Sequence, residues 1–281
     1  MRLNQNMESL NVYKNYSKNL KTQSKAMERI SSGSKINSTK DNPNKMGVRE
    51  GLRLQLKGLQ SAQKNLQDGV SMIQATDGTL SSINESLIRM KELTVQAGGV
   101  QNESDLNIIQ NEIEQIKEGI NQMSSNSEFN GVKLLSGDNN DNNYLTHMTG
   151  ANSGEDMKIP LFNINTSTLK DEAGNSLKDL DITKDGGISK ALSIIDGAMQ
   201  TVTSARSKYG ALQNRMETTY DNIDESSISL VSAESRVGDA DIALEMSEYA
   251  RTSIISESSL AILAQTNNFP KDILRVLENM K

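Results

Sequence analysis

The chain of 281 residues contains no cysteine, no tryptophan and a single histidine. Without cysteine it can form neither disulfide bonds nor thiolate metal sites. The lone histidine, His147, therefore has no thiolate with which to complete a metal centre or a nucleophilic triad, and we interpret it as a surface loop residue. The sequence predicts no enzymatic site, no metal site and no cofactor.

Apolar side chains are also scarce. Hydrophobic residues make up 35% of the chain and aromatic residues 3%, which is thin for a compact globule of this length. No run of about 18 apolar residues is present to span a bilayer. The N-terminus, MRLNQNMESLNVYKN, lacks the continuous apolar stretch of a secretory signal. We expect that the protein, if it leaves the cell, uses a dedicated exporter.

The net charge of −6 leaves no basic field that would attract nucleic acid or an anionic membrane, so neither is expected as a partner. The charge is unevenly distributed, however. Arg2–Lys45 holds nine Lys or Arg against three acidic residues, whereas Asp221–Glu248 holds eight acidic residues against one Arg. The pattern is compatible with contact between these segments and equally with two separately solvated helix faces.

Two long stretches repeat apolar residues at steps of seven, which predicts long helices wound around one another with a left-handed supercoil. The earlier ladder consists of Leu52, Leu59, Leu66, Ile73, Leu80 and Leu87. The later ladder consists of Ile188, Ile195, Val202, Tyr209, Met216, Ile223, Leu230 and Val237.

The ladders predict helices over 44–96 and 188–237. The second is interrupted only by Gly210, whose cost of ~1 kcal/mol relative to alanine suggests a close backbone approach at that position. Between the two, a shorter helix is predicted from a seam with steps of three and four. That seam consists of Leu106, Ile109, Ile113, Ile116, Ile120 and Met123.

The helical period is absent from the predicted insert over 136–185, where Gly, Asn and Asp cluster. Two short runs, Tyr144–Thr149 and Met157–Phe162, flank a glycine-containing turn and predict a β-hairpin. Pro160 would confine the second strand to an edge. If this hairpin marks the tip, the two long helices can lie antiparallel as one rod, and the termini meet at its far end.

Both ends of the chain carry sparse apolar stripes, too thin to stabilise an isolated helix in water. We expect these ends to be disordered until a partner covers their apolar stripes, and we assign the stripes as a polymerisation seam. The N-terminal part of this seam is Leu3, Leu10, Tyr13, Leu20 and Met27. The C-terminal part is Leu260, Leu263, Ile273, Leu274 and Leu277, within a stripe that also includes Ile242, Met246 and Tyr249.

The predicted fold is mainly α, an elongated antiparallel helical bundle or coiled-coil rod with a small β-hairpin insert. We expect three parts. The ends, 1–43 with 240–281, form a terminal domain that is disordered in the monomer. Residues 44–135 with 186–239 form the helical rod, and 136–185 form a short surface insert.

Four stretches of the chain together resemble one family, the bacterial flagellins. They are NLQDGVSMIQATDGTL at Asn65–Leu80, LIRMKELTVQA at Leu87–Ala97, SEFNGVKLL at Ser127–Leu135 and LAQTNNFPKDIL at Leu263–Leu274. The resemblance covers Met1 to about Leu135 and about Ile188 to Leu277.

This resemblance implies a structural subunit that polymerises with copies of itself into the extracellular flagellar filament. It implies export through the flagellar type III apparatus with the terminal segments unfolded, and their pairing as an inner coiled coil on polymerisation. A flagellar export chaperone, the filament cap and hook-associated proteins are the implied further partners. The short insert resembles that of a minimal flagellin with little or no outer domain.

LIRMKELTVQA is also similar to the segment that vertebrate Toll-like receptor 5 recognises in many flagellins. By motif position, the resemblance implies Arg89, Leu93 and Glu112 as receptor contacts. Packing between filament subunits would use the same surface without any receptor, so both interpretations stay open.

Two alternative functions remain at this stage. The turn Asp41–Asn44 resembles the corresponding turn of the hook-filament junction protein, a hook-associated relative that shares both terminal helices. A secreted helical effector or adhesin that binds a host receptor without polymerising would also fit amphipathic ends.

Overall fold

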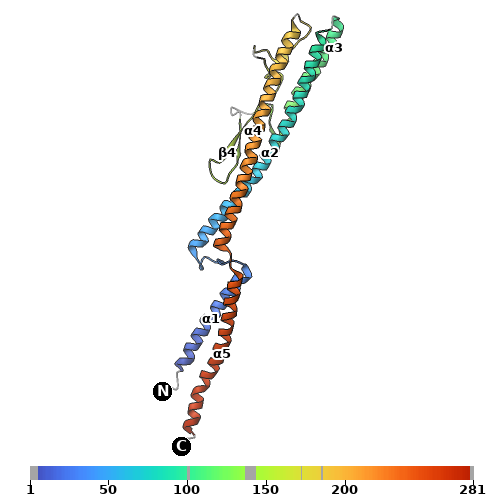
Figure 1. Cartoon of the computed structure of the whole chain (residues 1–281). Coiled ribbons are helices and arrows are strands. Elements are labelled where there is room, and N and C mark those ends of the chain that lie inside the picture. Colours follow the sequence, from blue (N-terminus) through green and yellow to red (C-terminus); the bar gives the residue numbers. More distant parts are fainter. Residues whose placement is uncertain (1–5, 100–101, 137–143, 172, 185, 279–281) are drawn as a thin grey trace. The chain divides into compact units, whose positions relative to one another are not determined.

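The computed structural model describes residues 6–99, 102–136, 144–171, 173–184 and 186–278, and within these ranges it is mainly α-helical (Figure 1). The mainly α fold and the long helices predicted from the apolar ladders are confirmed. The helices are α1 (Met7–Ser32), α2 (Pro43–Ala97), α3 (Glu103–Asn126), α4 (Gly187–Gly238) and α5 (Ile242–Glu278).

The chain separates into two compact units. One comprises Met1–Leu56 with Ile228–Lys281, and the other comprises Lys57–Ser227. Helices α2 and α4 contribute to both. The three-part division expected from the sequence stays a prediction. A division into compact units does not test whether the ends of the chain are disordered in the monomer.

Within Lys57–Ser227, α2 and α4 lie side by side and run antiparallel (Figure 1). Contacts between them advance along α2 while they retreat along α4. These contacts are Gln63 with Asp224, Asp77 with Arg206, and Lys91 with Asp196. Both helices bury their ladder residues, and a fully buried Leu or Ile side chain contributes roughly 1.5–3 kcal/mol. The buried members are Leu59, Leu66, Ile73, Leu80 and Leu87 on α2, and Ile195, Val202, Tyr209, Met216 and Ile223 on α4.

The insert contains the predicted β-hairpin. Strands β3 (Tyr144–Met148) and β4 (Asp156–Pro160) pair antiparallel, with His147 opposite Met157. A smaller pair, β1 (Glu128–Phe129) with β2 (Val132–Lys133), turns through Asn130 and Gly131, both at positive φ.

The segment after the hairpin packs more closely than a loop-rich insert was expected to. Its apolar side chains Ile164, Leu169, Leu177, Leu180 and Ile182 are buried. Polar side chains of α3 hold its backbone in place. Lys117 Nζ donates to the carbonyl oxygen of Lys178 at 3.1 Å, Gln110 Oε1 accepts from the amide of Ile182, and Asn121 Oδ1 accepts from the amide of Thr166.

The hairpin is docked onto α2 through His147 and two glycines. His147 Nε2 lies 2.5 Å from the carbonyl oxygen of Asn65, and since a carbonyl only accepts, this nitrogen carries the proton. A Cβ on Gly69 would lie 2.9 Å from His147 Nε2, and one on Gly58 would lie 2.9 Å from Ala151 Cβ. The interpretation of His147 as a surface loop residue is therefore wrong: it is half-buried and fixes the hairpin.

Tyr209 fixes the other side of the hairpin to α4. Its hydroxyl donates to the carbonyl oxygen of Pro160 at 2.9 Å, and its ring meets Phe162 edge-on with centroids 5.3 Å apart. Burial raises the pKa of the Tyr209 hydroxyl, so the group stays a neutral hydrogen-bond donor.

Gly210 does not mark a close backbone approach, and that expectation is wrong. A Cβ built on this residue would meet nothing within 4 Å, and the residue is exposed on α4. Glycine at this position therefore destabilises the helix relative to alanine, and no packing contact within the chain explains its presence.

We predict that Gly210→Ala raises the free energy of unfolding of the monomer by about 1 kcal/mol, because alanine loses less backbone entropy in a helix. Gly69→Ala is the matched control and should lower it, because His147 blocks the added methyl group. Urea denaturation followed by circular dichroism measures both. Equal effects of the two substitutions would contradict this assignment.

Candidate assembly surface of the terminal helices

Helices α1 and α5 pair side by side in antiparallel order (Figure 1). Asn6 Nδ2 near the start of α1 donates to the carbonyl oxygen of Thr266 at 2.8 Å. Further along α1, Asn19 Nδ2 donates to the carbonyl oxygen of Thr252 at 2.6 Å, and Arg29 meets Glu245 at 3.1 Å. The predicted pairing of the two ends as helices is therefore confirmed, while their disorder before polymerisation stays a prediction.

The seam between these two helices is largely polar. The side chains that turn inward follow steps of three and four on both helices. On α1 they are Ser9, Val12, Tyr16, Asn19, Gln23, Ala26 and Ile30, and on α5 they are Glu245, Tyr249, Thr252, Ser256, Ser259, Leu263 and Thr266. Hydrogen bonds in such a seam contribute about 0.5–1.5 kcal/mol each and define the register, while little apolar area is buried.

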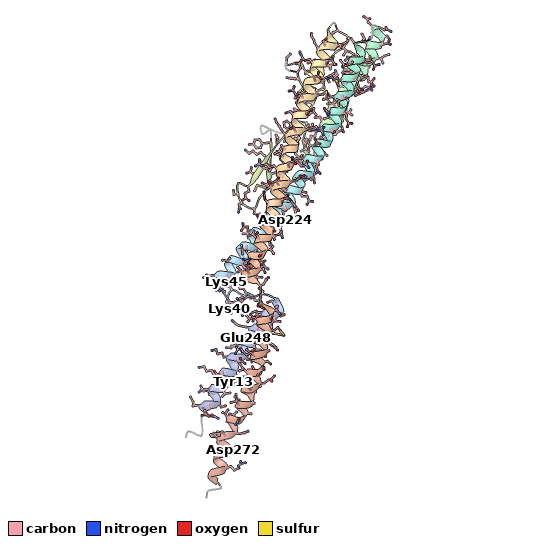
Figure 2. All side chains as sticks on the ribbon, in the orientation of Figure 1. Tyr13, Lys40, Lys45, Asp224, Glu248 and Asp272 are labelled. Atoms are coloured by element: carbon pink, nitrogen blue, oxygen red, sulfur yellow. The ribbon has the colours of Figure 1, made fainter. Side chains whose placement is uncertain are left out.

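The predicted polymerisation seam of α1 lies on a different side of the helix and faces solvent. Leu10, Tyr13, Leu20 and Met27 are 58%, 59%, 47% and 54% exposed. Figure 2 labels Tyr13 on α1 and Glu248 and Asp272 on α5, among the side chains that project from the pair.

The C-terminal residues of the predicted seam divide between two environments. Leu260 is exposed, whereas Leu263 is half-buried in the polar seam against α1. Leu3 and the side chains of Ile273, Leu274 and Leu277 lie outside the described residues.

Helix α5 exposes more apolar side chains than the sequence reasoning assigned to the seam. Those missed are Leu244, Ile254, Ile255, Ile262 and Phe269, all exposed. They lie off the stripe that begins at Ile242 and Met246, and three of them, Ile255, Ile262 and Phe269, follow a second repeat with steps of seven. An available signal was the apolar pair Ile254–Ile255, because adjacent positions cannot both face one partner helix.

The link between α1 and α2 is held by Arg49, which the sequence reasoning missed. Its guanidinium donates to Ser34 Oγ at 2.8 Å and to the carbonyl oxygen of Ile36 at 2.9 Å, and it meets Glu234 at 3.3 Å. Gly238 gives it room, since a Cβ there would lie 2.8 Å from Arg49 Nε.

Asp41, in the turn that resembled the junction protein, closes the same link. It accepts from the amides of Ser38 and Asn37. These hydrogen bonds hold the pKa of the Asp41 carboxyl below its usual value.

The three residues implied as receptor contacts differ in accessibility. Arg89 and Glu112 are exposed and meet at 3.0 Å across α2 and α3. The hydrogen bond that Arg89 donates to Glu112 holds the pKa of the Arg89 guanidinium above its usual value. Leu93 is only 2% exposed and belongs to the core.

Among the residues that the structure describes, no group of three or more His, Cys, Asp or Glu side chains is arranged to hold a metal ion. No helix in this part of the chain combines the length and the hydropathy needed to cross a bilayer.

Comparison with known proteins places both ends of the chain in one family. Residues 3–140 match the bacterial flagellin N-terminal helical region, and residues 192–277 match the bacterial flagellin C-terminal helical region. The chain is 38% identical to a flagellin of Bacillus subtilis (strain 168), over 99% of this chain and 100% of that protein. It is 32% identical to the flagellar filament 30.7 kDa core protein of Treponema maltophilum, again over 99% and 100%.

A structure from Vibrio parahaemolyticus described as a flagellar hook-associated protein is similar in fold, with a TM-score of 0.62. It covers 71% of this chain and 100% of that chain at 16% identity, which supports the fold alone. The full-length identities favour a flagellin over the junction protein and over an unrelated secreted effector or adhesin. The chain belongs to the bacterial flagellin family and is a structural subunit of the flagellar filament.

Proposed function

We propose that the apolar sides of α1 and α5 drive polymerisation, because they are left exposed in the single chain and would be buried between neighbouring copies. The observation that carries the proposal is the exposure of Leu10, Leu20 and Leu260 on helices whose mutual contact is polar. In a stable two-stranded coiled coil the most apolar side chains lie between the helices. Here they lie outside, where other copies can cover them.

The energetic gain is large enough to decide assembly. Burial of a Leu or Ile side chain contributes roughly 1.5–3 kcal/mol. Association costs on the order of 4–15 kcal/mol in lost freedom of motion. The exposed residues of α1 and α5 together exceed that cost, whereas any single one does not. Assembly should therefore depend on the whole surface and be cooperative.

The same weak pairing suits export. Helices held together by a polar seam separate at low cost, so the ends can pass unfolded through the flagellar type III apparatus and pair again afterwards. We place the assembled protein outside the cell, with an export chaperone, the filament cap and hook-associated proteins as further partners. Its role is structural and requires no catalytic residue.

The test of polymerisation is the double substitution Leu10→Asp with Leu20→Asp. Losing the burial of two leucines should raise the critical concentration for assembly by at least about a hundredfold. Both side chains are exposed, so the helix content of the monomer, measured by circular dichroism, should not change. Sedimentation of polymer from purified monomer measures the critical concentration.

Asn11→Asp with Asn15→Asp is the matched control, since it adds the same charge at exposed positions of α1 outside the apolar side. This control should assemble as the unsubstituted chain does. Normal filaments from the leucine variant at the usual concentration would contradict the proposal.

We infer a second binding role for the surface formed by Arg89 and Glu112, as a contact for Toll-like receptor 5. Both side chains are exposed and fix each other's position across two helices. Leu93, being buried, would position this part of α2 from beneath without touching the receptor.

Exchanging the two charges, Arg89→Glu with Glu112→Arg, keeps the ion pair but reverses the pattern presented to a partner. We predict at least about a tenfold loss of affinity for the purified receptor ectodomain, measured by surface plasmon resonance. Arg215→Glu, at an exposed position of α4, is the control and should leave binding unchanged. Undiminished binding of the exchanged variant would reject this role.

A further inference from the structure

One side of α1 carries a basic stripe, and among the described residues only one of its four lysines meets an acidic side chain. Lys14, Lys18, Lys21 and Lys25 follow steps of four and three, so they share one side of the helix, and all are exposed. At 3.6 residues per turn this side lies roughly opposite Asn19 and the seam against α5. Lys25 lies 3.6 Å from Asp41.

The other three lysines form no ion pair with any residue that the structure describes. Like charges spaced three and four apart on a helix repel one another. The single chain therefore holds an unfavourable arrangement that an acidic partner would relieve.

An acidic stripe of similar length lies on α4. Glu217, Asp221 and Glu225 follow steps of four and are exposed, and none meets a cationic side chain in the described part of the chain. At 1.5 Å per residue this stripe extends about 12 Å, against about 16 Å for the basic one.

We propose that the basic side of α1 docks against the acidic side of α4 in a neighbouring copy of this chain. The charges of the two stripes are complementary, and the basic stripe borders the exposed apolar side chains Leu10 and Leu20 on α1. Complementary charges of this kind select the partner and its register. The inference rests on the proposed assembly through the terminal helices and names one pair of surfaces that meet in it.

We take the partner of the basic stripe to be a second copy of this chain. The negative net charge gives no general attraction to polyanions or anionic membranes. The two stripes lie on the same polypeptide, so every copy brings both to the filament. A heterologous contact of this kind can repeat from one copy to the next, and it builds a helical filament when the rotation does not close into a ring.

Charge reversal and its rescue test the proposal. The basic-side variant is Lys14→Glu, Lys18→Glu and Lys21→Glu. The acidic-side variant is Glu217→Lys, Asp221→Lys and Glu225→Lys. The combined variant carries all six substitutions and restores opposite charges across the proposed contact. Assembly of each purified chain is measured as the critical concentration by sedimentation, after circular dichroism has verified the helix content of the monomer.

We expect each single-side variant to raise the critical concentration by about tenfold and the combined variant to return to within about threefold of the unsubstituted chain. The matched control is Lys40→Glu, Lys57→Glu and Lys190→Glu, which changes the net charge equally at exposed lysines outside the stripe. It should assemble normally.

Two outcomes would overturn the inference. Normal assembly of both single-side variants would show that the stripes do not meet. If the basic-side variant loses assembly and the combined variant does not regain it, the lysines bind a different partner, such as an anionic surface. In either case the unsubstituted chain still polymerises, so the proposed function stands. Failure of the unsubstituted chain to polymerise would instead reject the proposed function.

Discussion

The polar seam between α1 and α5 is the constraint on which the behaviour of the terminal helices depends. Asn19, Thr252 and Ser256 meet where a stable coiled coil would place leucine or isoleucine. Because these contacts define register but bury little apolar area, the pair forms without satisfying the apolar side chains of either helix. Leu10 and Leu20 remain exposed to water, and we propose that the filament buries them.

The unit Lys57–Ser227 follows the opposite principle. Its ladders face one another, so the residues with the strongest drive to leave water are already buried, and polar side chains of α3 hold the insert against the core. Most of the ladder residues of this unit are therefore buried in a single chain, although Ile88, Val95 and Ile108 stay exposed, while the terminal helices leave a larger share of their apolar side chains open. We propose that this difference makes the terminal helices the main site of assembly when copies are brought together.

Much of this division could be predicted from the sequence, because a seven-residue apolar repeat is a local signal that places a core regardless of the partner. The ladders through Leu66 and Tyr209 are examples. The β-hairpin could be predicted from another local signal, two short runs that flank a glycine-containing turn. The side of α1 that faces α5 could not be predicted, since Ser9, Asn19 and Gln23 interrupt its apolar residues and leave no continuous hydrophobic period. The docking of His147 and the open surroundings of Gly210 depend on which segments meet in space, which residue spacing does not encode.

Methionine oxidation of dilute monomer and of assembled filament tests the central claim most directly, since it reports which side chains leave water on assembly. Met27 and Met246, 54% and 50% exposed on α1 and α5, should oxidise readily in the monomer and become protected in the filament. Met148 on the hairpin should oxidise in both states, and the buried Met216 in neither. Equal oxidation of Met27 and Met246 in monomer and filament would contradict the account.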